Sequence, residues 1–318
     1  MTHSAAAPAR KPSRMGLYAP YVLLVLFMLA WSGAWLALRA NLEHRLDATA
    51  DRLRAAGWQV AWSDRRLSGY PFRLDLDFTD LRLAEPSGWG LEAPALKTEA
   101  YAFMPQHWML AAPAGVTLVR PGSAAVRIDA AVLRASISGL DQYPPRFSLE
   151  GEGLTFTPAP GAKPFAAQAA AAVELHTAAG PDDQGALFVS LDKVQGPQSG
   201  LLRLIAGGKP FDLTGELVFS HASAARGRDW PNLLRNWSRA GGVADVRQFT
   251  VTVGQALLAS RSGTLTVDPD GRIAGAIGAR LTAASPAGPN QGQTAALGFQ
   301  DGKTLLGPLP IGPAPRLY

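Results

Sequence analysis

From Trp58 onward, apolar and polar residues alternate in short runs with a period of two. In the clearest run, Phe72, Leu74, Leu76 and Phe78 alternate with charged residues. Successive side chains of a β-strand point to opposite faces, so this run predicts a half-buried strand whose apolar residues share one face.

The alternation loses its phase after this run. The next apolar residues are Leu81 and Leu83, where strict alternation would place them at positions 80 and 82. A β-bulge inserts one extra residue into one strand and would return both leucines to the apolar face. We therefore expect a bulge near Thr79 and Asp80.

Similar runs recur along the chain, separated by turn signals such as Pro121-Gly122 and Asp270-Gly271. Strands do not alternate with helices, which disfavours a parallel α/β sheet. The pattern predicts a mainly β fold, an antiparallel meander with a few short helices. The other expected strands are 96–103, 108–118, 125–138, 146–157, 171–176, 186–194, 211–220, 247–253, 257–267, 273–281, 295–299 and 303–306.

One helix is expected in the second half of the chain. Asp229 can cap its N-terminus, and Pro231 suits its first turn. Its apolar residues recur at helical spacing and form one stripe: Trp230, Leu233, Leu234 and Trp237. Two interpretations are open, a helix that plugs the end of a sheet or packs on its concave face, and a lid or partner-docking helix.

The N-terminal part contains an uncharged segment, Met15 to Leu38. It is long enough to cross about 30 Å of hydrocarbon as a helix. A cleaved signal peptide is the alternative, but its apolar part usually has only about 7 to 15 residues. We expect a permanent anchor.

The charges around this segment predict its orientation. Arg10, Lys11 and Arg14 precede it, whereas both signs follow it. By the positive-inside rule the N-terminus lies in the cytoplasm, and the main domain is periplasmic in a Gram-negative cell. We expect a cytoplasmic tail (1–14), a transmembrane helix in the inner membrane (15–39), a membrane-proximal helix that continues it or packs on the domain (40–57), and an exported β-rich domain (58–318).

Charge argues against nucleic acid as a partner. The chain has 30 basic and 25 acidic residues, but four basic residues lie before the first acidic one, so 26 basic residues remain against 25 acidic ones. Nucleic-acid binders concentrate cations on one face, and nothing in the remaining sequence indicates such a concentration.

No set of residues typical of catalysis is visible. The chain has no cysteine, and its five histidines form no H-x-x-x-H or H-E-x-x-H arrangement. Glu174 and His176 could share a strand face, but zinc needs three or four ligands. We expect no cofactor, no metal site and no enzymatic activity, with an exported hydrolase of dispersed active-site residues as a remote alternative.

Several short motifs resemble a known family. They are Ala56-Gly57-Trp58, Gly69-Tyr70-Pro71-Phe72-Arg73-Leu74-Asp75, Ala93-Pro94-Ala95-Leu96, Pro105-Gln106-His107-Trp108, and the Gly-Pro-rich ending after Asp301-Gly302-Lys303. On these residues the chain is similar to the bacterial domain-of-unknown-function family numbered 2125, over nearly its whole length.

That family in turn resembles the AsmA-like superfamily. The resemblance implies an elongated, curved sheet with an apolar groove on a membrane anchor, and a role in envelope maintenance or lipid movement. It supplies no catalytic residues. We therefore expect membrane lipids as partners. A scaffold that pairs with envelope proteins through a sheet edge is the alternative. The candidate groove residues are Phe72, Leu74, Leu76, Phe78, Trp230, Leu233, Leu234 and Trp237.

Overall fold

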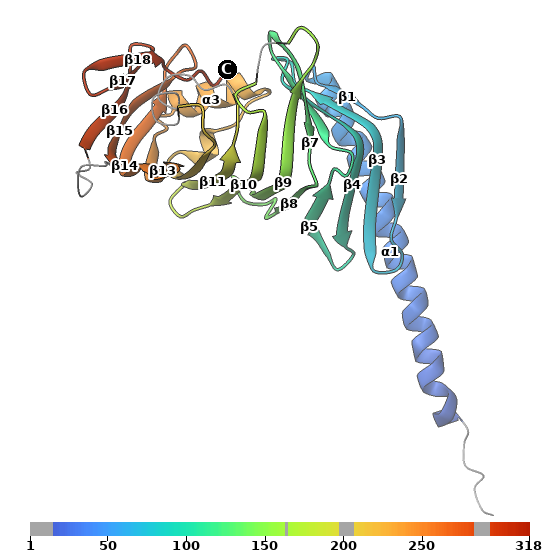
Figure 1. Ribbon diagram of the computed structural model, residues 1–318. Coiled ribbons are helices and arrows are strands. Elements are labelled where there is room, and N and C mark those ends of the chain that lie inside the picture. Colours follow the sequence, from blue (N-terminus) through green and yellow to red (C-terminus); the bar gives the residue numbers. More distant parts are fainter. Residues whose placement is uncertain (1–14, 163–164, 197–206, 283–292) are drawn as a thin grey trace, which may run out of the picture.

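A computed structural model describes residues 15–162, 165–196, 207–282 and 293–318 (Figure 1). In the described residues, an antiparallel sheet of 18 strands carries one long N-terminal helix and one short helix. The expectation of a mainly β, antiparallel meander is confirmed. The cytoplasmic tail expected at 1–14 lies outside the described residues.

The long helix, α1 (Met15–Ala55), is continuous through both predicted N-terminal segments. It is long and apolar enough to cross a membrane. The helix ends where Gly57 adopts a φ of 90°. There the N–H of Trp58 donates to the carbonyl of Leu53, and that of Gly57 to Arg54. This pair of bonds is a Schellman motif, which a glycine favours because it has no Cβ.

In the described part of the chain, eighteen strands follow α1. The first nine are β1 (Gln59–Ala61), β2 (Asp64–Ser68), β3 (Arg73–Ala84), β4 (Gly90–Tyr101), β5 (Met104–Ala111), β6 (Val116–Arg120), β7 (Ser123–Asp129), β8 (Val132–Ser138) and β9 (Arg146–Pro158). The others are β10 (Ala169–Ala179), β11 (Gly185–Val194), β12 (Phe211–Phe219), β13 (Ala244–Val253), β14 (Ala256–Val267), β15 (Ile273–Thr282), β16 (Gln293–Gln300), β17 (Lys303–Leu306) and β18 (Leu309–Pro313). Between β12 and β13 lie a 3-10 turn, η1 (Ala222–Ala224), and helix α3 (Trp230–Arg239).

The sheet is a meander with one fork. From β9 to β18 each strand pairs with the next. Between β4 and β9 the sheet divides into two branches. In one branch, half of β4 is joined to half of β9 by β5 and β8. In the other branch, the remaining halves of β4 and β9 are joined by β6 and β7. The prediction of one strand at 108–118 and one at 125–138 was wrong, because each range contains two strands that belong to different branches. The short strands β1, β2 and β18 were not expected.

The change of phase in β3 has a different cause from the expected bulge. Phe78 pairs with Leu96 and Leu81 with Ala93, so the register of β3 and β4 runs on without an inserted residue. Instead Asp80 adopts a positive φ of 50°. Asn and Asp tolerate this conformation better than most residues, and it turns Leu81 to the buried side that Phe78 occupies.

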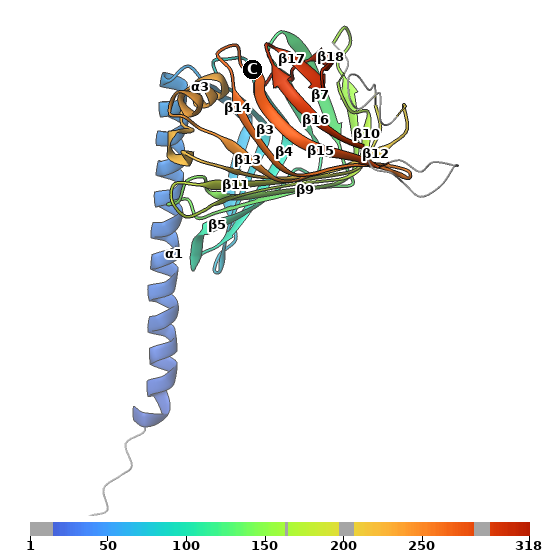
Figure 2. The same cartoon turned by 90° about the vertical axis from the view of Figure 1, so that its left-hand side faces the viewer.

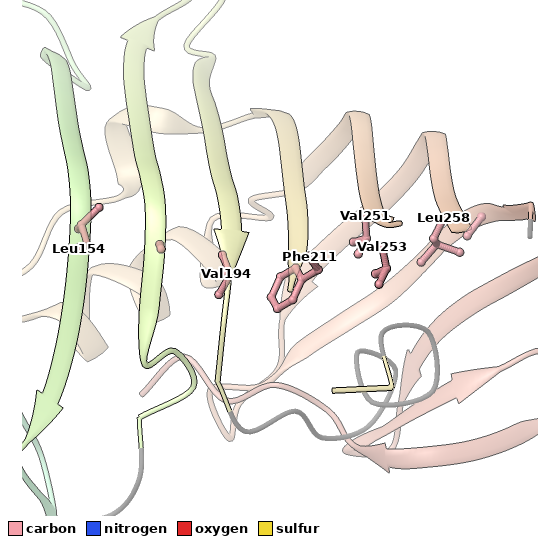
Figure 3. Packing of buried hydrophobic residues seen from close by; sticks show 8 residues of the cluster. Leu154, Val194, Phe211, Val251, Val253 and Leu258 are labelled. Atoms are coloured by element: carbon pink, nitrogen blue, oxygen red, sulfur yellow. The ribbon is translucent and has the colours of Figure 1, made fainter. Parts of the chain in front are cut away.

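The sheet curls around an apolar interior. In Figure 2, β3 and β4 at one end and β15 to β18 at the other rise on the same side of β9–β13. Figure 3 shows that buried side chains from successive strands line up across the sheet, among them Leu154, Phe211 and Leu258. A second buried cluster lies near α1, and a third lies at the β15–β18 end.

Candidate functional site

Two rows of residues, apolar except for Thr177 and Gly215, cross the inner face of the sheet perpendicular to its strands. Strand register places their members opposite one another from β5 to β13. The first row contains Leu110, Ala135, Leu149, Leu175, Val189, Gly215 and Phe249, and the second Trp108, Ile137, Phe147, Thr177, Leu187, Leu217 and Val246. We call them the inner rows.

The inner rows are partly open to solvent over β5 to β12. Leu149 and Leu175 pair directly, and both are only half-buried, as are Leu110, Phe147 and Leu187. A closed sandwich would bury such central positions between two sheets. The inner rows therefore form an apolar surface that the rest of the described chain covers incompletely.

At the β3 end the same face is closed by α1. Leu76 and Phe78 are 6% and 7% exposed, and Leu46 of α1 packs against their cluster. Leu74 is 1% exposed. The three predicted groove residues of β3 share one face, as expected, but they form the core under α1.

Phe72 departs from this set. It lies in the turn between β2 and β3, is 60% exposed, and its ring lies 6.3 Å from that of Trp31 in α1. The turn residue therefore meets α1 and does not join the buried apolar face. The alternation predicted Phe72 on the apolar face of the strand, and this was wrong because the strand begins only at Arg73.

Helix α3 lies at the ends of strands β12 and β14. Asp229 caps it by accepting a hydrogen bond from the N–H of Asn232 at 2.8 Å, and a proline occupies the first turn, as predicted. The buried Trp237 donates its indole N–H to the carbonyl of Ser220 at 2.7 Å, and Ser238 donates to that of Val267 at 2.6 Å.

The apolar stripe of α3 is only partly buried. Leu234 and Trp237 are buried, Leu233 is half-buried, and Trp230 is 39% exposed. The indole of Trp230 donates to the carbonyl of Leu317, near the C-terminus. These bonds fasten α3 to the ends of several strands, which is the geometry of an end plug. Whether its stripe contacts a ligand remains a prediction.

The outer face of β3 to β9 is polar and contains a cavity of about 650 Å³. Ion pairs cross it, with Arg73 2.9 Å from Asp75 and Arg134 2.6 Å from Glu150. A second, more apolar pocket of about 190 Å³ extends it toward the β4–β5 turn and is lined by Tyr101 and Met104 among others. The charged side chains around the first cavity thus distinguish the outer face from the inner rows, which contain no charged residue.

Acidic and imidazole groups are dispersed over the described part of the chain. Glu174 and His176 lie 3.7 Å apart, and the imidazole of His176 stacks on Phe188. Within residues 15–162, 165–196, 207–282 and 293–318, no group of three or more His, Cys, Asp or Glu side chains could hold a metal ion.

Sequence reasoning missed both the inner rows and the contact of Phe72 with the anchor. The rows could have been found from the period-two leucines and valines of β9, β10 and β11, since these strands carry apolar residues at every second position in their centres. The contact with α1 joins positions about 40 residues apart, and no local pattern marks it.

A family model described as "Uncharacterized protein conserved in bacteria (DUF2125)" matches residues 35–287. The chain therefore belongs to this family, as its motifs suggested. No curated protein and no solved structure matches it.

Proposed function

We propose that this DUF2125 protein is a non-catalytic, single-pass protein of the bacterial inner membrane whose periplasmic sheet binds the hydrocarbon chains of lipids in envelope maintenance. The observation that carries the proposal is the pair of inner rows, which present half-buried apolar side chains across β5 to β12.

An apolar ligand explains why these side chains remain uncovered. Soluble proteins rarely leave a contiguous apolar patch larger than a few hundred Å² in contact with water, unless the patch binds something. The inner rows form a long strip, because they follow the strand register across several strands. A flexible acyl chain can cover such a strip more completely than a compact ligand can. Each methylene group buried there would contribute about 0.8 kcal/mol.

The anchor supports a lipid as the source of those chains. From Tyr18 to Ala30, α1 is apolar and exposed, as expected of a segment surrounded by membrane. The AsmA-like resemblance of the sequence motifs implies the same arrangement, a membrane helix followed by a curved sheet with an apolar groove.

The test is photo-crosslinking in cells with benzophenone side chains at Leu149 and Leu175. The matched controls are Glu150 and Glu174, which are the adjacent residues on the same two strands, pair with each other and point to the outer face. Their side chains are 40% and 52% exposed. We expect lipid adducts, identified by mass, at the leucine positions and not at the glutamate positions.

Equal labelling of all four positions, or adducts with protein alone at the leucines, would contradict lipid binding by the inner rows. Extraction of lipid from the purified full-length chain provides the second measurement. Protein adducts at the leucines would instead favour the scaffold alternative.

A scaffold that acts through a sheet edge has less support. Its partner would have to pair with a strand at an end of the sheet. At the C-terminal end, β18 contains Pro310 and Pro313, which have no backbone N–H to donate.

A further inference from the structure

Two turns at one end of the sheet present large apolar side chains to the outside. One connects β2 to β3, and the other connects β4 to β5. The backbone N–H of Ala102 in the second turn donates to the carbonyl of Phe72 in the first at 2.8 Å, so the turns form one unit. Its exposed residues, which we call the apolar tip, are Tyr70, Phe72, Tyr101, Phe103 and Met104, with exposed fractions of 54%, 60%, 49%, 60% and 52%.

The apolar tip is fastened to the membrane helix. The indole of Trp31 donates to the carbonyl of Pro71 at 2.9 Å, and the hydroxyls of Ser32 and Tyr70 share a hydrogen bond of 2.7 Å. The ring of Trp35 meets that of Tyr70 edge to face at 5.4 Å. Figure 1 shows the lower ends of β3 to β5 beside the middle of α1.

The length of α1 sets the height of these contacts. From Tyr18 to Ala30 every residue of α1 is exposed, a length of only about 20 Å at 1.5 Å per residue. The hydrocarbon core is about 30 Å thick. Counted from Met15, the first residue after the charged tail, about 30 Å of helix ends near Trp35. The contacts of the tip with α1 therefore fall within the last turns of the span.

We propose that the apolar tip inserts into the interfacial layer of the same bilayer that α1 crosses, as a second attachment. Aromatic rings with a polar edge favour this layer. Charged residues directly beside the tip limit its depth, since Arg73 follows Phe72, Glu99 lies two residues before Tyr101, and the two charged side chains pair at 3.3 Å. The inference rests on the proposed anchor, but not on lipid binding by the inner rows.

The chain contains no cysteine, so single cysteines can report insertion site by site. Phe72→Cys and Phe103→Cys are labelled with the environment-sensitive fluorophore NBD in the full-length protein, reconstituted in phosphatidylcholine vesicles. Leu309→Cys is the control, because Leu309 is 65% exposed and lies in β18 at the far end of the sheet (Figure 1). Leu24→Cys, in the exposed part of α1, reports the anchor itself.

We expect blue-shifted emission, and quenching by lipids with a doxyl group near the headgroup, at positions 72 and 103 but not at 309. Position 24 should be quenched by lipids with a doxyl group deep in the acyl chain, because it lies near the middle of the span. Quenching at position 24 without quenching at 72 and 103 would overturn the insertion of the tip and leave the anchor intact. Absence of quenching at position 24 would overturn both. A change at Phe72 could disturb its contact with Trp31. Position 103 provides an independent probe, because the ring of Phe103 stacks only on Tyr101 among the ring contacts of the described residues.

Discussion

Trp35 donates its indole N–H to the main-chain carbonyl of Arg73 at 2.9 Å, although the two residues are 38 positions apart. The indole is 5% exposed. The bond joins α1 to the first residue of β3. The position of the sheet relative to the helix thus depends on a few specific contacts made by Trp31 and Trp35.

Trp35→Phe should lower the stability of the full-length protein in detergent by about 1 kcal/mol, because the ring remains but the carbonyl of Arg73 loses its donor. The measurement is thermal or denaturant unfolding followed by near-UV circular dichroism. Leu36→Ala is the control, since Leu36 is 58% exposed. An equal loss in both variants would mean that the hydrogen bond does not stabilise the contact.

Leu76→Asp should destabilise the domain by several kcal/mol, because Leu76 is 6% exposed and an ionised side chain there would be buried without a partner. The neighbouring Asp77→Asn should cost less than about 1 kcal/mol, as its side chain lies on the outer polar face beside the cavity. Similar tolerance of both changes, judged from unfolding midpoints, would show that the assigned faces are wrong.

Asp47 on α1 forms an ion pair with Arg65 on β2. The hydrogen bond from Arg65 holds the pKa of Asp47 below its ordinary value of 3.8. A carboxyl whose pKa is lowered by folding stabilises the folded state above its unfolded pKa, and loses that contribution as the pH falls through its folded pKa. Asp47→Asn should therefore cost up to about 1 kcal/mol at pH 7, since the carboxylate is largely exposed.

The difference between Asp47→Asn and the parent chain should shrink as the pH drops below about 4. Unfolding midpoints at several pH values measure it. Asp51→Asn is the matched control, because Asp51 pairs with Arg54 only within the helix. A difference that stays constant down to pH 3 would indicate that the ion pair has no role.

The orientation of the chain can be tested with a reporter fused after Tyr318. We expect alkaline phosphatase, which is active only outside the cytoplasm, to be active in this fusion, because the positive charges precede the span. Green fluorescence from a fusion that matures only in the cytoplasm would contradict this orientation. The mature protein should also retain Met15 to Leu38, as N-terminal sequencing would reveal.

The sequence predicted those parts of the fold that depend on local pattern. Alternation located β3 and β9 to β17, and Asp229 with Pro231 located the start of α3. The pattern could not show that α1 would cover Leu74, Leu76 and Phe78, because coverage depends on contacts between distant segments. It therefore assigned to an open groove residues that lie in the core, while the half-buried positions are those of the inner rows, farther along the sheet.

The change of phase at Asp80 illustrates the same limit. Alternation showed where the apolar residues change from even to odd positions. A residue with positive φ and an inserted residue both produce this change in the sequence pattern. Only the register with β4 distinguishes them, and it retains the pairing of Phe78 with Leu96 and of Leu81 with Ala93.

Helix α1 runs without a break from the free apolar segment to its glycine-terminated end beside β1. Successive residues of an α-helix are rotated by about 100° about its axis. Each face of the exposed N-terminal part of α1 therefore points in a fixed direction relative to the sheet. The sheet therefore cannot rotate about the axis of α1 independently of the helix. Any neighbouring transmembrane helix that recognises one side of α1 would thereby also set the direction in which the curled sheet points along the membrane surface.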